Sequence, residues 1–518
     1  MTEGLSGELS TIFYARLGKK LLIVSLLLLP ILPSVDVIAQ GSFQKARTIV
    51  TTDGEVDDQD SFIRMLLYSN EFDLVGLVYS SSQWHYKGDG KRTKYTSAMP
   101  MTAKRYGERT ELRWPGTTWM EAHIDQYSKV YENLKKHAAG FPSPDYLKSI
   151  IRVGNIDFEG EMEHDTPGSD FIKQILLDAD TNVVYLQIWG GTNTVARALK
   201  SIEEQYKAQP EWQSLKRRIS RKAILYAVLD QDNTYQKYVA PNWPEIKVLY
   251  NAAQFWNFAY PWPRVVPLPL QAYLRGAWFD KNIRTDHGPL MKQYYLWGDG
   301  RQIENDPEHN QGDTAVMRKA GMTQYDFISE GDSPAYFHLI DVGLDNLQDA
   351  SFGGWGGRMV RSKSNPSRWE DGDNVTDFNP YTKRYDKAYP QTRWIDVLQE
   401  DFAARADWCV STVEDANHPP VVNLAHEKHL VGKPGKVMNL AVNASDPDGD
   451  KLSCKWWQYE EVDSYVGKIQ LMNSGKLLSS FKIPLDARSG DTFHLIAEVS
   501  DDGAPKLTRY RRVIVTVQ

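Results

Sequence analysis

The sequence predicts two domains: an α/β domain with a mostly parallel sheet and flanking helices, followed by a smaller β-sandwich. Up to about residue 250, short β-rich apolar segments alternate with segments of helical spacing, which is typical of a parallel sheet covered by helices. From about residue 419, short alternating runs are separated by turn sequences such as DPDGD and NSG. Regularly spaced short strands of this kind indicate a sandwich of about a hundred residues.

Five segments are expected to form the strands of the α/β domain, at residues 48–52, 74–81, 183–189, 222–229 and 246–251. Helical spacing appears between them in SFIRMLLYSN, DFIKQILLDA and TVARALKSIEEQY, and again later in WIDVLQEDFAARADW. Residues 255–400 are rich in Trp, Tyr, Pro and Gly, and we expect them to form long loops over the ligand face of the sheet. The stiff pair Pro419-Pro420 marks the linker, so the predicted domains are residues 40–418 and 419–518.

Composition restricts the classes of partner. The net charge of −7 gives no electrostatic reason to expect nucleic acid. The chain has 16 Trp and 27 Tyr, whose flat rings suit either ordinary packing or stacking on sugars. Ordinary packing is favoured for most of these rings, and oligomerisation is left open.

The N-terminus resembles a secretory signal. Two lysines precede an apolar stretch at residues 21–32, and Val37-Ile38-Ala39 has the small-residue pattern of a cleavage site. The apolar stretch is short and interrupted by Pro30, so residues 1–39 are expected to be cleaved rather than to remain as a stable membrane span. A secreted or periplasmic protein follows from this. The two cysteines, Cys409 and Cys454, can pair or stay free in such a compartment, and the sequence does not decide between these states.

Residues 51–68, TTDGEVDDQDSFIRMLLY, crowd four aspartates and a glutamate where a strand leads into a helix. Asp57 and Asp58 could serve only as acidic residues of the first helical turn, where each contributes about 0.3–1 kcal/mol. Such a role needs one or two carboxylates, whereas Asp53, Glu55, Asp57 and Asp58 fall within six residues. A hard divalent cation such as calcium takes several carboxylate oxygens and relieves their repulsion, so the cluster favours a metal site.

The spacing Asp53-x-x-x-Asp57-Asp58 after a first strand resembles the aspartate signature of the nucleoside hydrolase family, and VVYLQIWGGTNTVARAL at 183–199 is similar to another segment of that family. The segments EGDSPAYFHLIDVGL and DPDGD…WWQYEE extend the resemblance to nucleoside-hydrolase-like proteins of the cellulose-binding Sde182 type, which carry a C-terminal Ig-like domain. The resemblance implies a nucleoside-hydrolase-like α/β fold and a bound calcium ion.

The resemblance also implies roles for individual residues. Calcium would be bound by Asp53, Asp58, the main-chain carbonyl of Trp189, and Asp332. Asp53 would act as general base, and sugar would be bound by Asp57, Gln83, Trp84 and Asn193. Where the family often carries the acid for the leaving group, this chain has Gly331, with Glu330 beside it. Glu330 or His85 is therefore expected to assist the leaving group, although a lone histidine such as His85 is as often an ordinary loop residue.

The favoured function is a secreted calcium-dependent glycoside hydrolase that cleaves a glycosidic or N-ribosidic bond of plant or other polysaccharide-derived carbohydrate. The alternative is a non-catalytic carbohydrate-binding or cellulose-binding protein that uses the same cleft. A nucleoside salvage hydrolase is a weaker third possibility, because secretion and the appended sandwich argue against it. In the sandwich, DPDGDK resembles part of a calcium loop, but an Asp-Gly hairpin turn is favoured because no later glutamate completes the loop.

Overall fold

The computed structural model describes residues 45–518, so the expected signal peptide at 1–39 lies outside the described residues. The central feature is an eight-stranded sheet with the order β5-β2-β1-β6-β7-β8-β10-β9. All neighbouring strands are parallel except β9 and β10. The strands are β1 (Arg47–Thr52), β2 (Asp73–Tyr79), β5 (Ile151–Val153), β6 (Val184–Ile188), β7 (Ala223–Val228), β8 (Lys247–Asn251), β9 (Val360–Arg361) and β10 (Arg368–Glu370). The five predicted strands are confirmed, whereas β5, β9 and β10 have only two or three residues each and give no clear pattern in the sequence.

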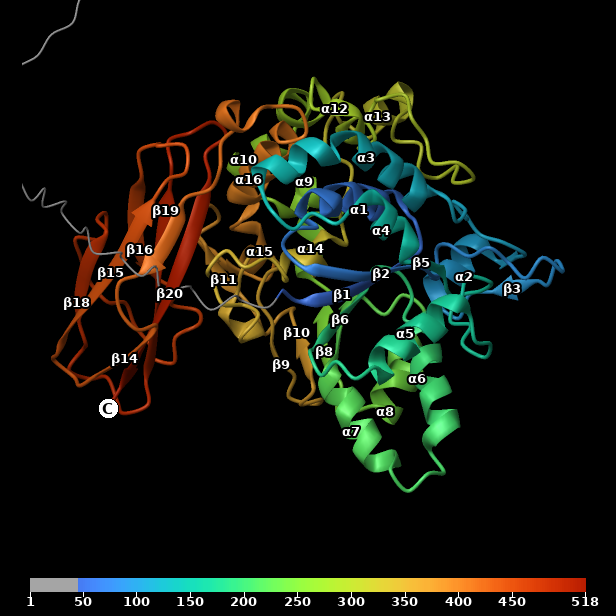
Figure 1. Cartoon of the computed structure of the whole chain (residues 1–518), viewed down its shortest axis with the longest axis horizontal. Helices are drawn as coiled ribbons and strands as arrows, with labels where there is room; N and C mark the ends of the chain where they lie inside the picture. Colours follow the sequence, from blue (N-terminus) through green and yellow to red (C-terminus); the bar gives the residue numbers. More distant parts are fainter. Residues whose placement is uncertain (1–44) are drawn as a thin grey trace, which may run out of the picture. The chain divides into compact units, whose positions relative to one another are not determined.

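Helices cover both faces of this sheet (Figure 1). Consecutive side chains of a strand point to opposite faces, and β1 follows this rule: Ile49 belongs to the core with α5, α6 and α7, and Val50 to the core with α1, α3 and α16. The sequence of a strand that is buried on both faces is a continuous apolar run, so β1 and β6 could be predicted from the sequence. The longer helices are α1 (Val56–Tyr68), α3 (Trp119–His137), α5 (Pro167–Leu177), α6 (Asn193–Tyr206), α7 (Trp212–Lys222) and α16 (Ile395–Asp407).

Residues 252–394 contain only short helices and strands joined by loops, as the sequence predicts. The remaining helices are α2 (Pro100–Tyr106), α4 (Pro144–Ser149), α8 (Ala240–Asn242), α9 (Trp262–Val265), α10 (Leu268–Gln271), α11 (Gly276–Phe279), α12 (Gly288–Met291), α13 (Thr314–Lys319), α14 (Ser333–Phe337) and α15 (Tyr389–Thr392). Two small ribbons pair β3 (Tyr95–Thr96) with β4 (Glu108–Arg109) and β11 (Asp377–Asn379) with β12 (Arg384–Asp386).

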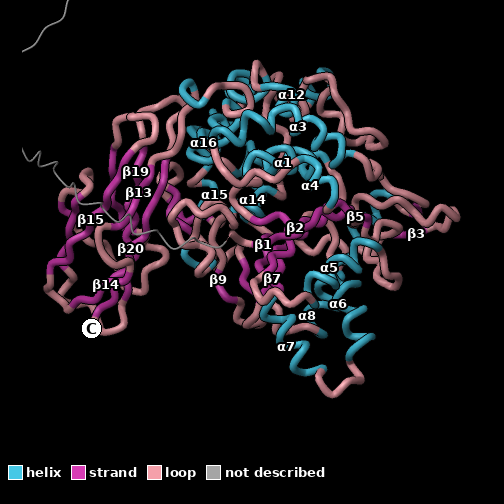
Figure 2. Tube along the Cα trace, viewed as in Figure 1, coloured by secondary structure: helices cyan, strands magenta, loops and turns pink. Residues whose placement is uncertain are grey.

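Residues 421–518 form two four-stranded sheets around a core of their own, and Figure 2 shows this region as strands and loops. One sheet has the order β13-β15-β18-β17 and the other β14-β20-β19-β16. The strands are β13 (Val421–Leu424), β14 (His429–Gly432), β15 (Val437–Ser445), β16 (Ser453–Gln458), β17 (Leu471–Met472), β18 (Leu478–Lys482), β19 (Thr492–Ser500) and β20 (Thr508–Val517). The β-sandwich prediction is confirmed.

The loop that contains DPDGD is not a hairpin turn. It leads from β15 to β16, which lie in different sheets, so the expectation of an Asp-Gly hairpin is wrong here. The sequence shows the turn residues but not which strands they join.

The sandwich packs on the α/β domain through buried side chains, and residues 45–518 are one compact unit. Tyr459, Ile496 and Tyr510 belong to the large core of the α/β domain. The Tyr459 hydroxyl donates to Oδ2 of Asp377 at 2.7 Å. Cys409 and Cys454 are free thiols. Within residues 45–518, no helix is both long and apolar enough to cross a membrane.

Candidate functional site

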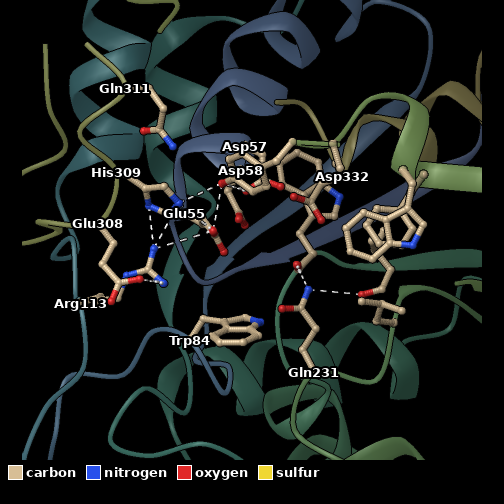
Figure 3. A pocket seen from close by; sticks show the side chains of 18 of the residues that line it. Glu55, Asp57, Asp58, Trp84, Arg113, Gln231, Glu308, His309, Gln311 and Asp332 are labelled. Carbon is tan, nitrogen blue, oxygen red and sulfur yellow. Dashed lines mark hydrogen bonds and ion pairs between the residues drawn. The ribbon is translucent and has the colours of Figure 1, made fainter. Parts of the chain in front are cut away.

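A cavity of about 470 Å³ lies beyond the carboxyl ends of the central strands, where ligands bind in open parallel sheets. Its wall combines aromatic and charged side chains that come from loops far apart in the sequence (Figure 3). The aromatic residues are Trp84, Trp189, Phe255, Trp256, Tyr260 and Trp297, and the charged residues are Glu55, Asp57, Asp58, Arg105, Arg113, Glu308, His309 and Asp332. Flat rings beside convergent polar groups suit a sugar-like ligand.

The turn between β1 and α1 brings the aspartates to this cavity. Gly54 has a φ of +82°, and a Cβ there would lie 2.7 Å from Pro115 and Trp119, so only glycine fits this turn. The chain then enters α1, whose first turn carries Asp57 and Asp58. The Thr52 hydroxyl at the end of β1 donates to Asp58 and fixes the orientation of its carboxylate.

Asp57, Asp58 and Asp332 form the acidic cluster of the cavity. Each offers a carboxylate oxygen, and these oxygens lie within 4.8 Å of one another. Asp332 directly precedes α14, and Gly331 permits the close approach, since a Cβ at Gly331 would lie 2.7 Å from Oδ2 of Asp57. The position where the nucleoside hydrolase pattern often has a histidine is therefore filled by a glycine for steric reasons.

The acidic cluster is strongly self-repulsive. Burial, followed by the charges of Glu55 and Asp53, raises the pKa of Asp57 to about 7. Burial and the neighbouring aspartates also raise the pKa values of Asp58 and Asp332 well above their ordinary range. No ion pair joins these three carboxylates to a Lys or Arg in residues 45–518. Several buried carboxylate oxygens without a cationic partner are the donor set that suits calcium.

Asp53 lies beside this cluster but is not one of the three carboxylates whose oxygens converge. It is 2% exposed, and its charge contributes to the raised pKa values of Asp57, Asp58 and Asp332. Its Oδ2 atom is buried without a hydrogen-bond partner and lies 3.5 Å from Nδ1 of His85. A buried carboxylate oxygen with no partner is costly, which fits a position that also binds a cation.

A second group of charged residues adjoins the acidic cluster, and the sequence analysis missed most of it. Nε2 of His309 lies 2.9 Å from Oε1 of Glu55, and its other nitrogen, Nδ1, contacts Asp306. Nε of Arg113 donates to Oδ1 of Asp306 at 2.8 Å, and Nε2 of His85 lies 3.0 Å from Oδ2 of the same carboxylate. We call Glu55, His85, Arg113, Asp306 and His309 the histidine network.

The histidine network is held in its charged form. Burial acts to lower the pKa of His85, but its contacts with the carboxylates of Asp306 and Asp53 raise it to about 9. Burial likewise opposes protonation of His309, and Glu55 and Asp306 raise the pKa of this residue. Burial acts to raise the pKa of Glu55, but the charge and hydrogen bond of His309 lower it to about 2. The cavity therefore has unpaired carboxylates at the acidic cluster and paired positive and negative side chains in the adjoining histidine network.

His85, Asp306 and His309 also have ligand atoms within 4.8 Å of one another. The guanidinium of Arg113 already places a positive charge beside these atoms, since its Nη2 lies 2.8 Å from Nδ1 of His309 and 3.1 Å from Oδ2 of Asp306. A cation placed there would be repelled by Arg113. The acidic cluster is therefore the better candidate metal centre.

The structure places Glu330 away from the cavity, contrary to the expected role as acid for the leaving group. Its side chain is fully buried, 3.4 Å from Nη1 of Arg64, and accepts hydrogen bonds from Ser333 at 2.6 Å and from Tyr294. Glu330 and Asp332 are two residues apart, but only Asp332 lines the cavity. The loop backbone, which the sequence does not reveal, directs the two carboxylates to different surroundings.

Gln83 and Asn193 also differ from their expected sugar-binding roles. Oε1 of Gln83 accepts a hydrogen bond from Thr102 at 2.6 Å, and Gln83 lines a different cavity, beside Asp230. Asn193 is fully buried, and its Nδ2 donates to Ser81 and to the carbonyl of Asn155, both at 2.9 Å. It joins the loops that follow β2, β5 and β6, and so has a structural role.

Trp84 lines the cavity, as expected for a residue that contacts sugar. His85 does not line it but lies directly behind it: it is fully buried, and its ring stacks 6.0 Å from that of His309. The carbonyl of Trp189, the expected main-chain ligand, accepts a hydrogen bond from Nε2 of Gln231 at 2.8 Å. A carbonyl oxygen has two lone pairs, so this bond leaves one for a cation.

Comparison with known proteins agrees with this fold. Residues 47–359 match the family model described as "Cellulose-binding Sde182, nucleoside hydrolase-like domain", and residues 437–517 match "Cellulose-binding protein Sde0182, C-terminal domain". A solved structure of a nucleoside hydrolase-related hypothetical protein from Saccharophagus degradans, associated with carbohydrate metabolism, is 28% identical. The alignment covers 92% of this chain and 100% of that one, with a TM-score of 0.66.

A plant nucleoside hydrolase is 10% identical over 71% of this chain and 99% of that one, and its TM-score of 0.30 is too low to support an argument. None of the curated proteins compared with the chain is significantly similar to it. The first family model covers more than half of the chain, including most of the parallel sheet, and the second covers most of the C-terminal sandwich. This chain therefore belongs to the family of cellulose-binding Sde182 proteins with a nucleoside hydrolase-like domain.

Proposed function

We propose that this chain is a calcium-dependent hydrolase that cleaves the glycosidic or N-glycosidic bond of a carbohydrate. The observation that carries the proposal is the convergence of Asp57, Asp58 and Asp332 on one side of an aromatic-lined cavity. His309 of the histidine network, whose pKa is raised by Glu55 and Asp306, lines the same cavity. Glycosyl transfer to water uses one group as base or nucleophile and another as acid, and a carboxylate and a protonated histidine can fill these two roles.

The residues present fit calcium. Asp57, Asp58 and Asp332 would bind it through carboxylate oxygens, with Asp53 and the carbonyl of Trp189 as further ligands, and all of these donors are hard oxygen atoms. When bound, calcium would neutralise the acidic cluster and favour ionisation of a coordinated water.

Asp53 is the proposed general base. Its unpartnered Oδ2 atom can accept the proton of an attacking water. His85, protonated at neutral pH because its pKa is raised to about 9, lies 3.5 Å from this oxygen and orients the carboxylate. Asp306 holds the other ring nitrogen of His85 at 3.0 Å. His85 is thus a positioning residue in the proposed reaction.

His309 replaces Glu330 and His85 as the proposed acid for the leaving group. It lines the cavity, and the neighbouring carboxylates of Glu55 and Asp306 raise its pKa, which favours the protonated ring. Its Nε2 atom lies 3.0 Å from the hydroxyl of Tyr260, which also lines the cavity and donates to Glu55 at 2.9 Å. A proton at Nε2 of His309 is therefore positioned at the cavity wall.

A second candidate function is carbohydrate binding without turnover. One observation favours it: both ring nitrogens of His309 already contact carboxylates, Asp306 and Glu55. Carboxylates at both nitrogens stabilise the protonated ring, so proton transfer from His309 to a leaving group becomes less favourable. The family description, cellulose-binding, is consistent with this alternative.

A panel of plant-polysaccharide oligosaccharides and nucleosides distinguishes the two functions. We expect cleavage of at least one glycoside in calcium, none in chelator, and none by Asp53→Asn. Asp60→Asn is the matched control, because Asp60 is a buried aspartate of α1 whose carboxylate binds the main chain of Tyr295. Calcium-dependent binding without cleavage across the panel would reject the hydrolase and leave the binding protein.

We also propose that the protein is secreted or periplasmic, on the basis of the signal-like residues 1–39. N-terminal sequencing of the protein recovered from its native host should begin just after residue 39. An N-terminus at Met1 would contradict the proposal. We likewise propose that the C-terminal sandwich is Ig-like, on the basis of the resemblance of its sequence to the Sde182-type proteins.

A further inference from the structure

Three segments meet where the α/β domain leads into the sandwich: the linker around Asn417, the β15–β16 loop at 446–452 and the β19–β20 loop at 501–507. Nδ2 of Asn417 donates to the carbonyl of Pro505 at 2.7 Å. The amide of His418 donates to Oδ2 of Asp448 at 2.7 Å, and the amide of Lys451 donates to Oδ1 of Asp502 at 2.8 Å. The linker is therefore bound directly to both loops of the sandwich.

Three side-chain oxygens at this junction are buried and have no hydrogen-bond partner in residues 45–518: Oδ1 of Asn417, Oδ2 of Asp446 and Oδ2 of Asp501. Asn417 is 6% exposed and Asp501 is 2% exposed. Buried polar atoms normally have partners, so three orphan oxygens from three segments need an explanation. Main-chain groups satisfy the other carboxylate oxygens, because Oδ1 of Asp446 and Oδ1 of Asp501 each accept two amide hydrogen bonds.

The two loops of the junction also carry more aspartates than lysines, of which there are two, Lys451 and Lys506. Five aspartates occur in the two loops, and among the described residues their only ion pair is that of Asp448 with His418, at 3.0 Å. Burial is the main reason for the raised pKa of Asp501, and the charge of Asp446 adds to it. A side chain on Gly503 would lie 2.4 Å from Oδ2 of Asp450 and 2.3 Å from Nδ2 of Asn417, so this glycine lets the carboxylate and the amide approach. The carboxylates of Asp446 and Asp501, each with a buried Oδ2 atom, repel each other, and a bound cation would offset this repulsion.

We propose that this junction binds a divalent cation of the calcium class through the orphan oxygens of Asn417, Asp446 and Asp501. All the donors are oxygens, and the ligands come from loops that can adjust to the coordination distance, which suits calcium better than zinc or magnesium. The site is separate from the acidic cluster of the cavity and does not depend on the proposed hydrolase function.

The ion would connect the two domains. The linker carbonyl of Asn417 accepts a hydrogen bond from the indole of Trp408 at 2.9 Å, and Trp408 directly follows α16 of the α/β domain. Asp446 and Asp501 belong to the sandwich. A cation bound by all three segments would therefore hold the linker to both domains. Because it binds only the folded state, it would also raise the free energy of unfolding.

Calcium titration of the full chain by isothermal calorimetry tests the proposal, with Asp58→Asn as the background so that the cavity contributes little. We expect the Asp58→Asn chain to bind one calcium at the junction. Adding Asp501→Asn should weaken this binding at least about tenfold, because affinity follows the number of charged ligands. Asn keeps the Oδ1 acceptor that the amides of Gly503 and Leu507 need, so the loop should still fold. Adding Asp486→Asn, an exposed aspartate of the sandwich, should leave the binding unchanged.

A second variant keeps the test informative if the Asp501→Asn chain does not fold. Asp446→Asn likewise keeps the Oδ1 acceptor for the amides of Asp448 and Asp450, and it should give the same loss of calcium as Asp501→Asn. Chelator should also accelerate proteolysis in the linker at 411–420 in the wild-type chain. An Asp58→Asn chain that binds no calcium would overturn the proposal, as would calcium binding that both junction substitutions leave undiminished.

Discussion

Oδ2 of Asp53 lies 3.5 Å from Nδ1 of His85, and neither atom has a hydrogen-bond partner in residues 45–518. This contact joins the acidic cluster to the histidine network, because His85 also binds Asp306 at 3.0 Å. The charges of the histidine network are paired with one another, whereas the carboxylates of the acidic cluster have no Lys or Arg partner in residues 45–518. The arrangement leaves the acidic cluster able to bind a cation while the histidine network stays protonated.

The first prediction concerns calcium at the acidic cluster. Calcium at one hundred times its dissociation constant should stabilise the wild-type chain by about 2.7 kcal/mol through this site. Asp332→Asn should remove most of that gain, because it deletes one of three convergent carboxylates. Urea unfolding with calcium and with chelator measures the difference. Asp60→Asn is the control, and an equal calcium effect in the Asp332→Asn and Asp60→Asn chains would contradict the assignment.

The second prediction concerns pH in the absence of calcium. Burial and the charge of Glu55 raise the pKa of Asp57 from 3.8 to about 7. A raised pKa means that the folded state binds the proton more tightly, so this stabilisation is complete below pH 3.8 and is lost as the pH rises through 7. In chelator, the free energy of unfolding should therefore fall between pH 4 and 7, and Asp57→Asn should make the fall shallower. Calcium should reverse the trend, because ionised carboxylates bind it better.

A free energy of unfolding that changes with pH equally in Asp57→Asn and in wild type would show that Asp57 is not the titrating group. The exposed aspartate substitution Asp486→Asn serves as the matched control for charge removal.

The strands of the sheet and the position of the acidic cluster could be predicted because they depend on local patterns. β1 and β6 are continuous apolar runs, and Asp57 and Asp58 lie in the first turn of the helix that follows β1. The direction of side chains in loops could not be predicted in this way. Glu330 and Asp332 are two residues apart, yet one is buried against Arg64 and the other lines the cavity.

The histidine network was missed for a related reason. Arg113, Asp306 and His309 lie in loops without hydrophobic periodicity, and they meet Glu55 only through the tertiary fold. A weak signal was present in NDPEHN at 305–310, where an aspartate and a histidine are three residues apart in a proline-containing loop. Such a signal is common in loops and does not indicate a partner 250 residues away.

The third prediction concerns Glu330. Because Glu330 and Arg64 are both fully buried, Glu330→Gln leaves the Arg64 charge uncompensated and should destabilise the fold by about 3–5 kcal/mol. Activity per folded molecule should change little, since Glu330 does not line the cavity. Urea unfolding and a substrate assay on the same preparation separate the two effects. Glu304→Gln, at an exposed position, should change neither. A stable Glu330→Gln chain with lost turnover would restore Glu330 as the acid.

The fourth prediction concerns His309. If His309 protonates the leaving group, His309→Gln should slow cleavage of a natural glycoside by about 10²–10⁴-fold. An activated aryl glycoside needs little protonation and should be affected much less. His287→Gln is the matched control, because His287 pairs with Asp407 and does not line the cavity. Equal losses on both substrates would mean that His309 binds substrate and does not donate a proton.

The last prediction concerns the independence of the sandwich. Residues 419–518 have a core of their own, built around Phe481, Phe493 and Trp456, so we expect the isolated segment to fold. Separation from the α/β domain exposes Tyr459, Ile496 and Tyr510, which belong to the large core in the full chain. The isolated segment should therefore be less stable and should self-associate as its concentration rises.

Tyr459→Phe tests this contact directly. In the full chain the Tyr459 hydroxyl donates to the carboxylate of Asp377 at 2.7 Å, and a hydrogen bond to a charged group contributes about 1.5–3 kcal/mol. The substitution should cost that amount in the full chain and almost nothing in the isolated segment, where Asp377 is absent. Urea unfolding followed by tryptophan fluorescence measures both values. If the cost is the same in both, the hydroxyl acts within the sandwich and not across the domain contact; a segment with no cooperative transition would show that the sandwich needs the α/β domain to fold.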